Sequence, residues 1–258
     1  MKIKLNIILV LAVCFSQSVR SQITFPKDTD DRKIVSTLFE GNLSEKDSTC
    51  QWITNLSESI QFGSDLKDTL RTKIDTIFNY KEDSFRKIIL TSTYARNSDC
   101  HACQPSLGII ELNLNEETNS YEISQISKFI TKYGTWGEAP KKRGLLQLGK
   151  DIYCVKITEY SGGMGRKVGV TSLFKDGKKI FCFYSYDTNN DAVEFDYQKY
   201  KYSSTILFDK KTNTIKITKK GNESNNLGKI VKVNSISTYE YDGEFLTKKS
   251  TKNVLTKK

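Results

Sequence analysis

The residues with the most reactive side chains lie in one short segment, Cys100-His101-Ala102-Cys103. His101 is the only histidine of the chain, and it stands among six cysteines in all. Two thiolates and an imidazole suit zinc or cuprous copper, and two closely spaced cysteines can also act as a redox pair. The simplest role is a structural disulfide that staples the segment, for example to Cys50.

The surroundings of this segment help to choose between these roles. Pro105 and a strand-like alternation follow it, whereas a reactive thiolate is favoured at the start of a helix. A metal ion would need a further ligand from Cys154 or Cys182, because neighbouring Cys and His side chains do not easily share one ion. Covalent haem is excluded, since Gln104 and not histidine follows the second cysteine. We therefore expect a disulfide, with a redox or metal site as the alternative.

The expectation of a disulfide depends on export, which the N-terminus indicates. Lys2 and Lys4 precede an apolar stretch over residues 5–15, and a polar segment of small residues then leads to Ser21. This is the pattern of a secretory signal peptide over residues 1–21, and its apolar stretch is shorter than the ~20 residues that span a bilayer. We expect cleavage after Ser21 and a secreted or periplasmic mature chain.

A lipoprotein signal is the rival interpretation of the N-terminus. It would anchor the mature chain at Cys14, but Val13 stands where lipoprotein processing favours a smaller residue. No second long apolar stretch follows, so we expect no transmembrane helix.

The mature chain is basic and has an odd number of cysteines. Loss of Lys2, Lys4 and Arg20 lowers the formal net charge from +10 to +7. Residues 248–258 contain five lysines, and we expect a flexible tail that can contact anionic lipid or wall polymer at the envelope surface. Export argues against a nucleic-acid partner. Five cysteines remain, so at least one is unpaired or bonded to a partner.

The apolar periodicity predicts helices followed by strands. Residues 29–40 are predicted to form a helix, with Asp28 or Thr29 as its cap. Residues 64–80 are predicted to form a second helix, because apolar residues recur there in steps of four. The residues that carry this pattern are Leu66, Leu70, Ile74 and Phe78.

The rest of the chain has the alternation and the turns of antiparallel strands. About ten strands are predicted from residue 87 on, joined by hairpins such as the one at Asp176-Gly177. We expect an α+β fold that is mainly antiparallel β, namely a curved sheet, a sandwich or a barrel-like meander with two N-terminal helices packed on it. Residues 22–247 would form a single globular domain, with a helical part at 29–80 and a β part at 87–247.

Catalytic motifs are weak in this sequence. Histidine-dependent nucleophilic catalysis would have to use His101, which two cysteines flank. The glycine-rich segment 161–166 lacks the ending of a phosphate-binding loop, and the acidic segment 187–194 departs from the calcium-binding loop pattern at Ala192 and Gln198. We expect no cofactor, and whether the protein is an enzyme is left open, with a non-enzymatic role favoured.

Aromatic residues offer the better candidates for binding. Tyrosines with lysines between them cluster in the segment 184–202, where strands could present them to a protein or glycan partner. The candidate residues are Trp136, Tyr184, Tyr186 and Tyr197. The sequence thus predicts an exported, non-enzymatic binding protein that recognises a macromolecule such as an envelope component, or a toxin or enzyme to be inhibited. The alternative is an exported redox or metal-binding protein that uses Cys100, His101 and Cys103.

The position of signal cleavage can be tested directly. When the chain is expressed in a bacterium and recovered from the periplasm or medium, its N-terminal residue should be Gln22, because small residues at positions 19 and 21 fit the cleavage rule. Intact-mass and N-terminal peptide analysis measure this. A product that begins with a lipidated Cys14, or a chain retained whole in the cytoplasm, would contradict the prediction.

Overall fold

The structure of the protein is a computed structural model that describes most of the chain beyond the N-terminal segment. The described residues are 23–45, 48–55, 57–58, 69–81, 84–95, 104–134, 138–163, 166–189, 199–225 and 227–254. They form two antiparallel sheets and one helix with both ends described, α2. Within this part of the chain, no helix is long and apolar enough to cross a membrane. The mainly antiparallel β fold predicted from the sequence is thus confirmed.

The first sheet has seven strands in the order β1-β7-β6-β5-β4-β3-β2. Its N-terminal elements are short: β1 (Thr24–Pro26), α2 (Asp31–Leu38), β2 (Asn42–Ser44) and β3 (Thr49–Ile53). Its long strands are β4 (Thr69–Lys81), β5 (Phe85–Ala95), β6 (Ser106–Asn115) and β7 (Ser120–Lys132).

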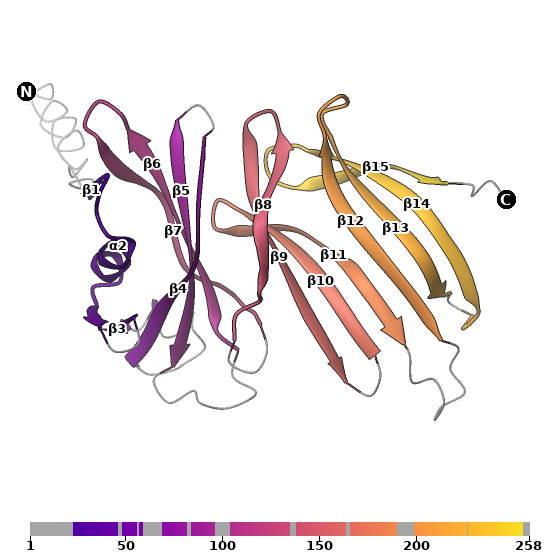
Figure 1. Ribbon diagram of the computed structural model, residues 1–258, viewed down its shortest axis with the longest axis horizontal. Coiled ribbons are helices and arrows are strands. Elements are labelled where there is room, and N and C mark those ends of the chain that lie inside the picture. The colour runs from indigo at the N-terminus through magenta and orange to yellow at the C-terminus, as the bar shows by residue number, and fades with distance from the viewer. Residues whose placement is uncertain are drawn as a thin grey trace, which may run out of the picture.

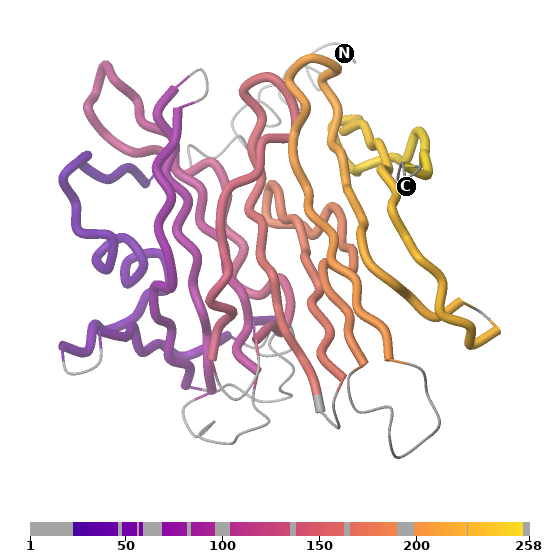
Figure 2. Tube along the Cα trace, turned by 45° about the vertical axis from the view of Figure 1, so that its right-hand side comes forward, coloured from indigo at the N-terminus to yellow at the C-terminus, as the bar shows by residue number. Residues whose placement is uncertain are grey.

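The second sheet is a meander of eight strands, β8 to β15, which pair in chain order. Its first four strands are β8 (Lys142–Gly149), β9 (Ile152–Gly163), β10 (Arg166–Lys175) and β11 (Lys178–Asn189). Its last four are β12 (Tyr200–Asp209), β13 (Thr214–Ser224), β14 (Ile230–Tyr241) and β15 (Leu246–Asn253). Figure 2 shows these hairpins following one another from pink through orange to yellow.

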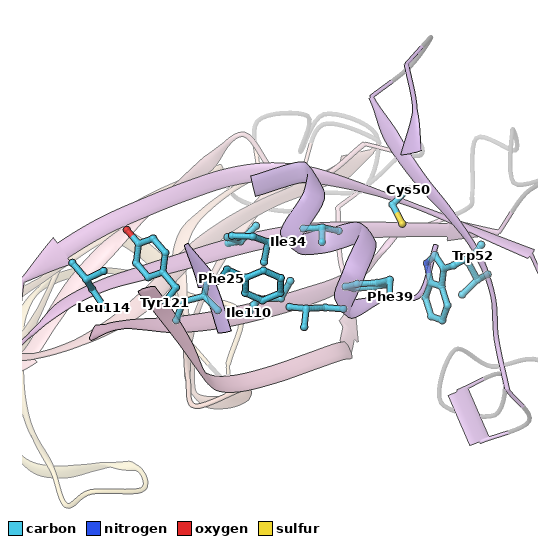
Figure 3. Packing of buried hydrophobic residues seen from close by; sticks show 13 residues of the cluster. Phe25, Ile34, Phe39, Cys50, Trp52, Ile110, Leu114 and Tyr121 are labelled. Carbon is cyan, nitrogen blue, oxygen red and sulfur yellow. The ribbon is translucent and has the colours of Figure 1, made fainter. Parts of the chain in front are cut away.

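The first sheet is covered on both faces. Neighbouring residues of a strand point to opposite sides, and in the central strands the residues on both sides are buried. Ile89 and Ile110 pack with α2, whose buried residues include Ile34 and Val35. Figure 3 shows this cluster, in which Trp52 and Phe39 close one end. The predicted helix at 29–40 is thereby confirmed as Asp31–Leu38. Its cap is Asp30, which accepts a hydrogen bond from the Arg32 backbone N at 2.9 Å.

The other face of the first sheet packs against the second sheet. Ile88 and Leu90 of β5 contact a cluster to which β9 and β10 contribute Val155, Ile157 and Phe174. Beyond it the second sheet curls, so that β8 approaches β12, β13 and β14 over a third cluster that includes Leu148 and Ile215. In Figure 1, α2, the first sheet, strands β8 and β9, and strands β12 to β14 follow one another across the molecule.

The second predicted helix, over residues 64–80, is wrong in its described part, because Thr69–Lys81 is strand β4. A step of four residues is also an even number, so Leu70 and Ile74 can share one face of a strand as well as of a helix. Asp75 is an extra residue in the pairing of β4 with β5, and after this bulge Phe78 packs in the core between the sheets. Backbone pairing on both sides of β4 outweighs the helix-like spacing.

The C-terminal segment is more ordered than the expected flexible tail from residue 248. Residues Leu246–Asn253 form β15, which pairs with Ser235–Tyr241 of β14. Leu246 is buried, whereas the rest of β15 is exposed. Backbone hydrogen bonds therefore hold a segment whose side chains alone suggested a solvated tail.

The hairpin between β10 and β11 fixes the second sheet against the first. Gly177 has φ +68°, and a Cβ atom there would lie 2.0 Å from Oγ of Ser127 on β7. Beside it Glu111 of β6 is buried, and this burial raises the pKa of its carboxyl group. Only glycine fits this turn, because its backbone is left-handed and its Cα touches the other sheet.

Replacement of this glycine should destabilise the protein more than replacement of an equivalent glycine in open space. Gly228 has φ +73° and no atom within 4 Å of an added Cβ, so Gly228→Ala should cost about 1–2 kcal/mol from the backbone alone. Gly177→Ala adds a steric clash and should cost about 2–4 kcal/mol. Chemical denaturation measures both, and equal losses would show that the hairpin does not contact β7 as described.

Candidate functional site

One face of the second sheet carries lysines and tyrosines and is the candidate binding site. Cross-strand partners in an antiparallel sheet project their side chains to the same side, so the strand register defines this face. Two adjacent rows of partners cross the six strands from β9 to β14. The first row is Tyr160, Gly169, Tyr186, Ser203, Lys220 and Asn234, and the second is Gly162, Lys167, Thr188, Lys201, Asn222 and Lys232. We call these twelve positions the lysine–tyrosine face.

The formal charge of the lysine–tyrosine face is entirely positive. None of the twelve positions is Asp or Glu, and its four lysines are all exposed. Among the described residues, the carboxylates of β12 to β14 pair with other lysines, namely Lys216, Lys219 and Lys249. The four lysines of the face are therefore not neutralised within the described chain, and their mutual repulsion favours a negatively charged ligand.

Gly169 lies between the two tyrosines of the first row. A Cβ atom on it would lie 3.0 Å from Cε1 of Tyr160 and 3.1 Å from Cβ of Tyr186. The absence of a side chain thus lets the two tyrosines approach the backbone between them. The strip of the sheet between the Tyr160 ring edge and the Tyr186 Cβ is one that only glycine can supply without displacing them.

Each of these tyrosines has a lysine beside its ring. Lys142, which is opposite Thr158 and on the same side of the sheet, donates to the Tyr160 hydroxyl at 2.8 Å. Its Nζ lies 4.8 Å from the centre of that ring, and Nζ of Lys201 lies 5.9 Å from the centre of the Tyr186 ring. An aromatic surface and an ammonium group are thereby presented together at both ends of the strip.

A pocket of about 280 Å³ adjoins the Tyr160 end of the face. Its lining comes from two segments: Lys142 with Thr158, Glu159 and Tyr160, and Gly134 with residues 138–141. The Gly134 backbone N donates to Oε1 of Glu159 at 2.7 Å, which fixes the second segment to β9. The pocket therefore extends the candidate binding surface beyond Tyr160, at the β9 end of the lysine–tyrosine face.

The opposite side of the same strands is neutralised by ion pairs. Arg166 donates to both carboxylate oxygens of Asp187 at 3.2 and 3.1 Å, and the Tyr200 hydroxyl lies 3.4 Å from the same carboxylate. Lys219 pairs with Glu223, and its Nζ lies 4.0 Å from the centre of the Tyr202 ring. Burial of Tyr202 raises the pKa of its hydroxyl group to about 12. Behind the lysine–tyrosine face, these two cations are therefore paired with acids.

The predicted aromatic binding residues are only partly brought together. Tyr186 belongs to the lysine–tyrosine face. Tyr184 is exposed but lies on the other side, because a bulge at Ser185 places Tyr186 opposite Gly169 and Tyr184 opposite Val170. Trp136 and Tyr197 lie outside the described residues.

The cysteines that the structure describes are free thiols. Cys50 and Cys154 are buried, and burial raises the pKa of Cys50 to about 11 and that of Cys154 to about 12. Cys182 is exposed. Cys100, His101 and Cys103 lie outside the described residues, and within those residues no three Cys, His, Asp or Glu side chains are grouped to hold a metal ion.

A second cluster of polar groups is buried between the two sheets. The bulge places the carboxylate of Asp75, which is 3% exposed, where it accepts hydrogen bonds from Ser92 and from the Tyr133 hydroxyl at 2.5 Å. Arg143 of β8 lies 3.9 Å away and donates to Thr76 at 2.9 Å. Because its members are buried, this cluster joins β4 and β5 to the second sheet rather than offering a site to a ligand.

Sequence reasoning missed most of the lysine–tyrosine face. Tyr160, Gly169 and Lys220 are 60 positions apart at most, but only the register of six strands brings them to one face. A signal was present in the hairpin at Asp176-Gly177, which fixes the pairing of β10 with β11. The bulge at Ser185 has no comparable signal.

Comparison with known proteins leaves the site as the basis for any functional conclusion. No family model, no curated protein and no solved structure matches the chain. The geometry and charge of the described residues therefore carry the argument.

Removal of the Tyr133 hydroxyl should weaken the buried cluster in a pH-dependent way. Tyr133→Phe removes one of the two hydroxyl donors to the buried Asp75 carboxylate and leaves Ser92 as the other, so it should cost about 1–3 kcal/mol of unfolding free energy at neutral pH. Burial and the Asp75 carboxylate raise the pKa of Tyr133 above the usual 10.0. Above pH 10 the unfolded chain loses this proton more readily than the folded one, so the wild-type advantage should shrink as pH rises.

Urea unfolding of wild type and variant at pH 7 and at several values above pH 10 measures this difference. Tyr184→Phe is the matched control, because Tyr184 is 59% exposed, and it should change stability little at any pH. A Tyr133→Phe protein as stable as wild type at pH 7 would contradict the role given to the cluster.

Proposed function

We propose that the protein is an exported, non-enzymatic binding protein that recognises a negatively charged macromolecule through the lysine–tyrosine face. The observation that carries the proposal is a face of twelve positions with four exposed lysines and no acid, next to an opposite face where cations are paired. Tyrosines at the same surface supply contact area beyond charge. An envelope component outside the cytoplasm is the class of partner that fits.

The distribution of charge along the chain supports the same proposal. Residues 138–258 contain 24 Lys and Arg against 13 Asp and Glu, whereas residues 22–137 contain 13 against 17. The two parts thus have formal charges of +11 and −4. An anionic surface would be attracted by the second sheet and not by the first, which orients the encounter.

Two other segments of the chain suggest further partners. Exposed lysines of β15, such as Lys248 and Lys252, would add a peripheral contact to an anionic envelope surface. The redox or metal-binding alternative depends on Cys100, His101 and Cys103. Metal analysis and thiol mapping of the mature protein test that alternative independently of the lysine–tyrosine face.

Reversal of three charges on the face should abolish binding to polyanions. The variant Lys201→Glu, Lys220→Glu and Lys232→Glu should bind dextran sulfate or polyphosphate at least about tenfold more weakly than wild type, because attraction becomes repulsion. Binding of the wild type should also weaken as salt rises. Biolayer interferometry of the purified mature protein measures both effects.

A control with the same net charge separates the face from the overall charge. Lys150→Glu, Lys210→Glu and Lys211→Glu change exposed lysines in hairpin turns and should reduce affinity by less than about threefold. Equal losses in the two variants would show that binding reflects net charge alone. No detectable wild-type binding to either polyanion would remove the proposal.

A further inference from the structure

The lysine–tyrosine face also indicates the chemistry of its partner, and we infer that this partner is an acidic polysaccharide. In this assignment sugar rings pack on Tyr160 and Tyr186 across Gly169, while carboxylate or sulfate groups of the polymer contact the surrounding lysines. The inference rests on the proposed function and narrows it to one class of anionic polymer.

The two tyrosines form a platform suited to sugar rings. Tyr160 and Tyr186 are two strands apart, a distance of about 10 Å at the usual strand spacing. Gly169 between them is buried, and because it has no side chain the edge of the Tyr160 ring lies close over its backbone. A sugar ring has apolar C–H faces and polar edges, which match the apolar ring and polar hydroxyl of tyrosine.

The remaining residues of the face match the other groups of such a polymer. Ser203 and Asn222 are exposed and supply a hydroxyl and an amide group that can both donate to and accept from sugar hydroxyls. The lysines are compact charges with rotatable donors, so they can follow acidic groups without a fixed geometry. The rows cross six strands, about 24 Å, which suits an extended chain better than a small ligand.

An anionic membrane or a polyphosphate would use only part of this face. Its exposed side chains are Lys, Tyr, Ser and Asn, with no aliphatic residue, tryptophan or phenylalanine among the twelve positions to enter a bilayer. Polyphosphate would be satisfied by the lysines alone, since it has no ring to stack on tyrosine. The tyrosine pair and its glycine therefore distinguish the polysaccharide from other polyanions.

The test compares polymers that share charge and differ in sugar rings. Mature protein is titrated with polygalacturonate, dextran sulfate, neutral dextran, polyphosphate and vesicles of phosphatidylglycerol, at equal ionic strength. We expect the two acidic polysaccharides to bind at least about tenfold more tightly, per anionic group, than polyphosphate or vesicles, since each ring contact adds about 0.5–1.5 kcal/mol. Neutral dextran should bind weakly.

Variants of the platform make the test specific. Tyr160→Leu with Tyr186→Leu should lower polysaccharide affinity about tenfold, whereas Tyr160→Phe with Tyr186→Phe keeps the rings and should stay within about threefold of wild type. Both should leave polyphosphate binding unchanged. Tyr184→Leu is the control on the opposite side of β11 and should change neither. Thermal unfolding confirms that each variant is folded.

Gly169→Ala probes the space between the rings. Its backbone is not left-handed, so alanine is compatible with the strand, but the added methyl group would displace the tyrosines by a few tenths of an ångström. We expect weaker polysaccharide binding with unchanged polyphosphate binding.

The possible results separate this inference from the proposed function. Polyphosphate or vesicles bound as tightly as the polysaccharides, with the leucine variants unaffected, would overturn the polysaccharide and leave an anion-binding face in place. Failure to bind any polyanion, with the Lys201, Lys220 and Lys232 reversal also without effect, would overturn both.

Discussion

The structure depends on a first sheet that must bury both of its faces. Ile88, Ile89 and Leu90 are consecutive, so they point alternately to two cores. The helix α2 packs on one face, and the second sheet covers the other. Because the second sheet serves as this cover at one end of its strands, with Val155 and Ile157 of β9 buried there, the other end of the same strands is free to carry Tyr160 and Gly162.

Polar groups within this contact give it a defined geometry. An apolar interface alone would tolerate small shifts of one sheet against the other. Asp75 with Arg143 of β8, and Glu111 with the hairpin at Gly177, instead require particular partners on facing elements. A buried carboxylate that loses its partners costs several kcal/mol, so these two points fix the second sheet and, with it, the direction in which its exposed face points.

The sequence predicts the strands and hairpins of this fold better than it predicts the β-bulges that set the strand register. Alternation at Ile110, Leu112 and Leu114 is specific for a strand, whereas the steps of four from Leu70 to Phe78 suit a strand or a helix. Bulges decide the rest: Asp75 and Ser185 each shift the register by one residue. A shift of one residue moves Tyr184 away from Tyr186, so no rule of local spacing could assemble the candidate site.

The like charges of the lysine–tyrosine face destabilise the second sheet, and the fold does not require them. Lys201, Lys220 and Lys232 lie on the neighbouring strands β12, β13 and β14, with Lys167 two strands further along the same face. Like charges placed so close together repel and destabilise the sheet. The opposite side shows that these strands can pair cations with acids, as Arg166 does with Asp187. Positions that depart from local rules of stability without structural need are commonly functional. The anionic chain that we propose as ligand would relieve this repulsion, so its binding would also stabilise the second sheet.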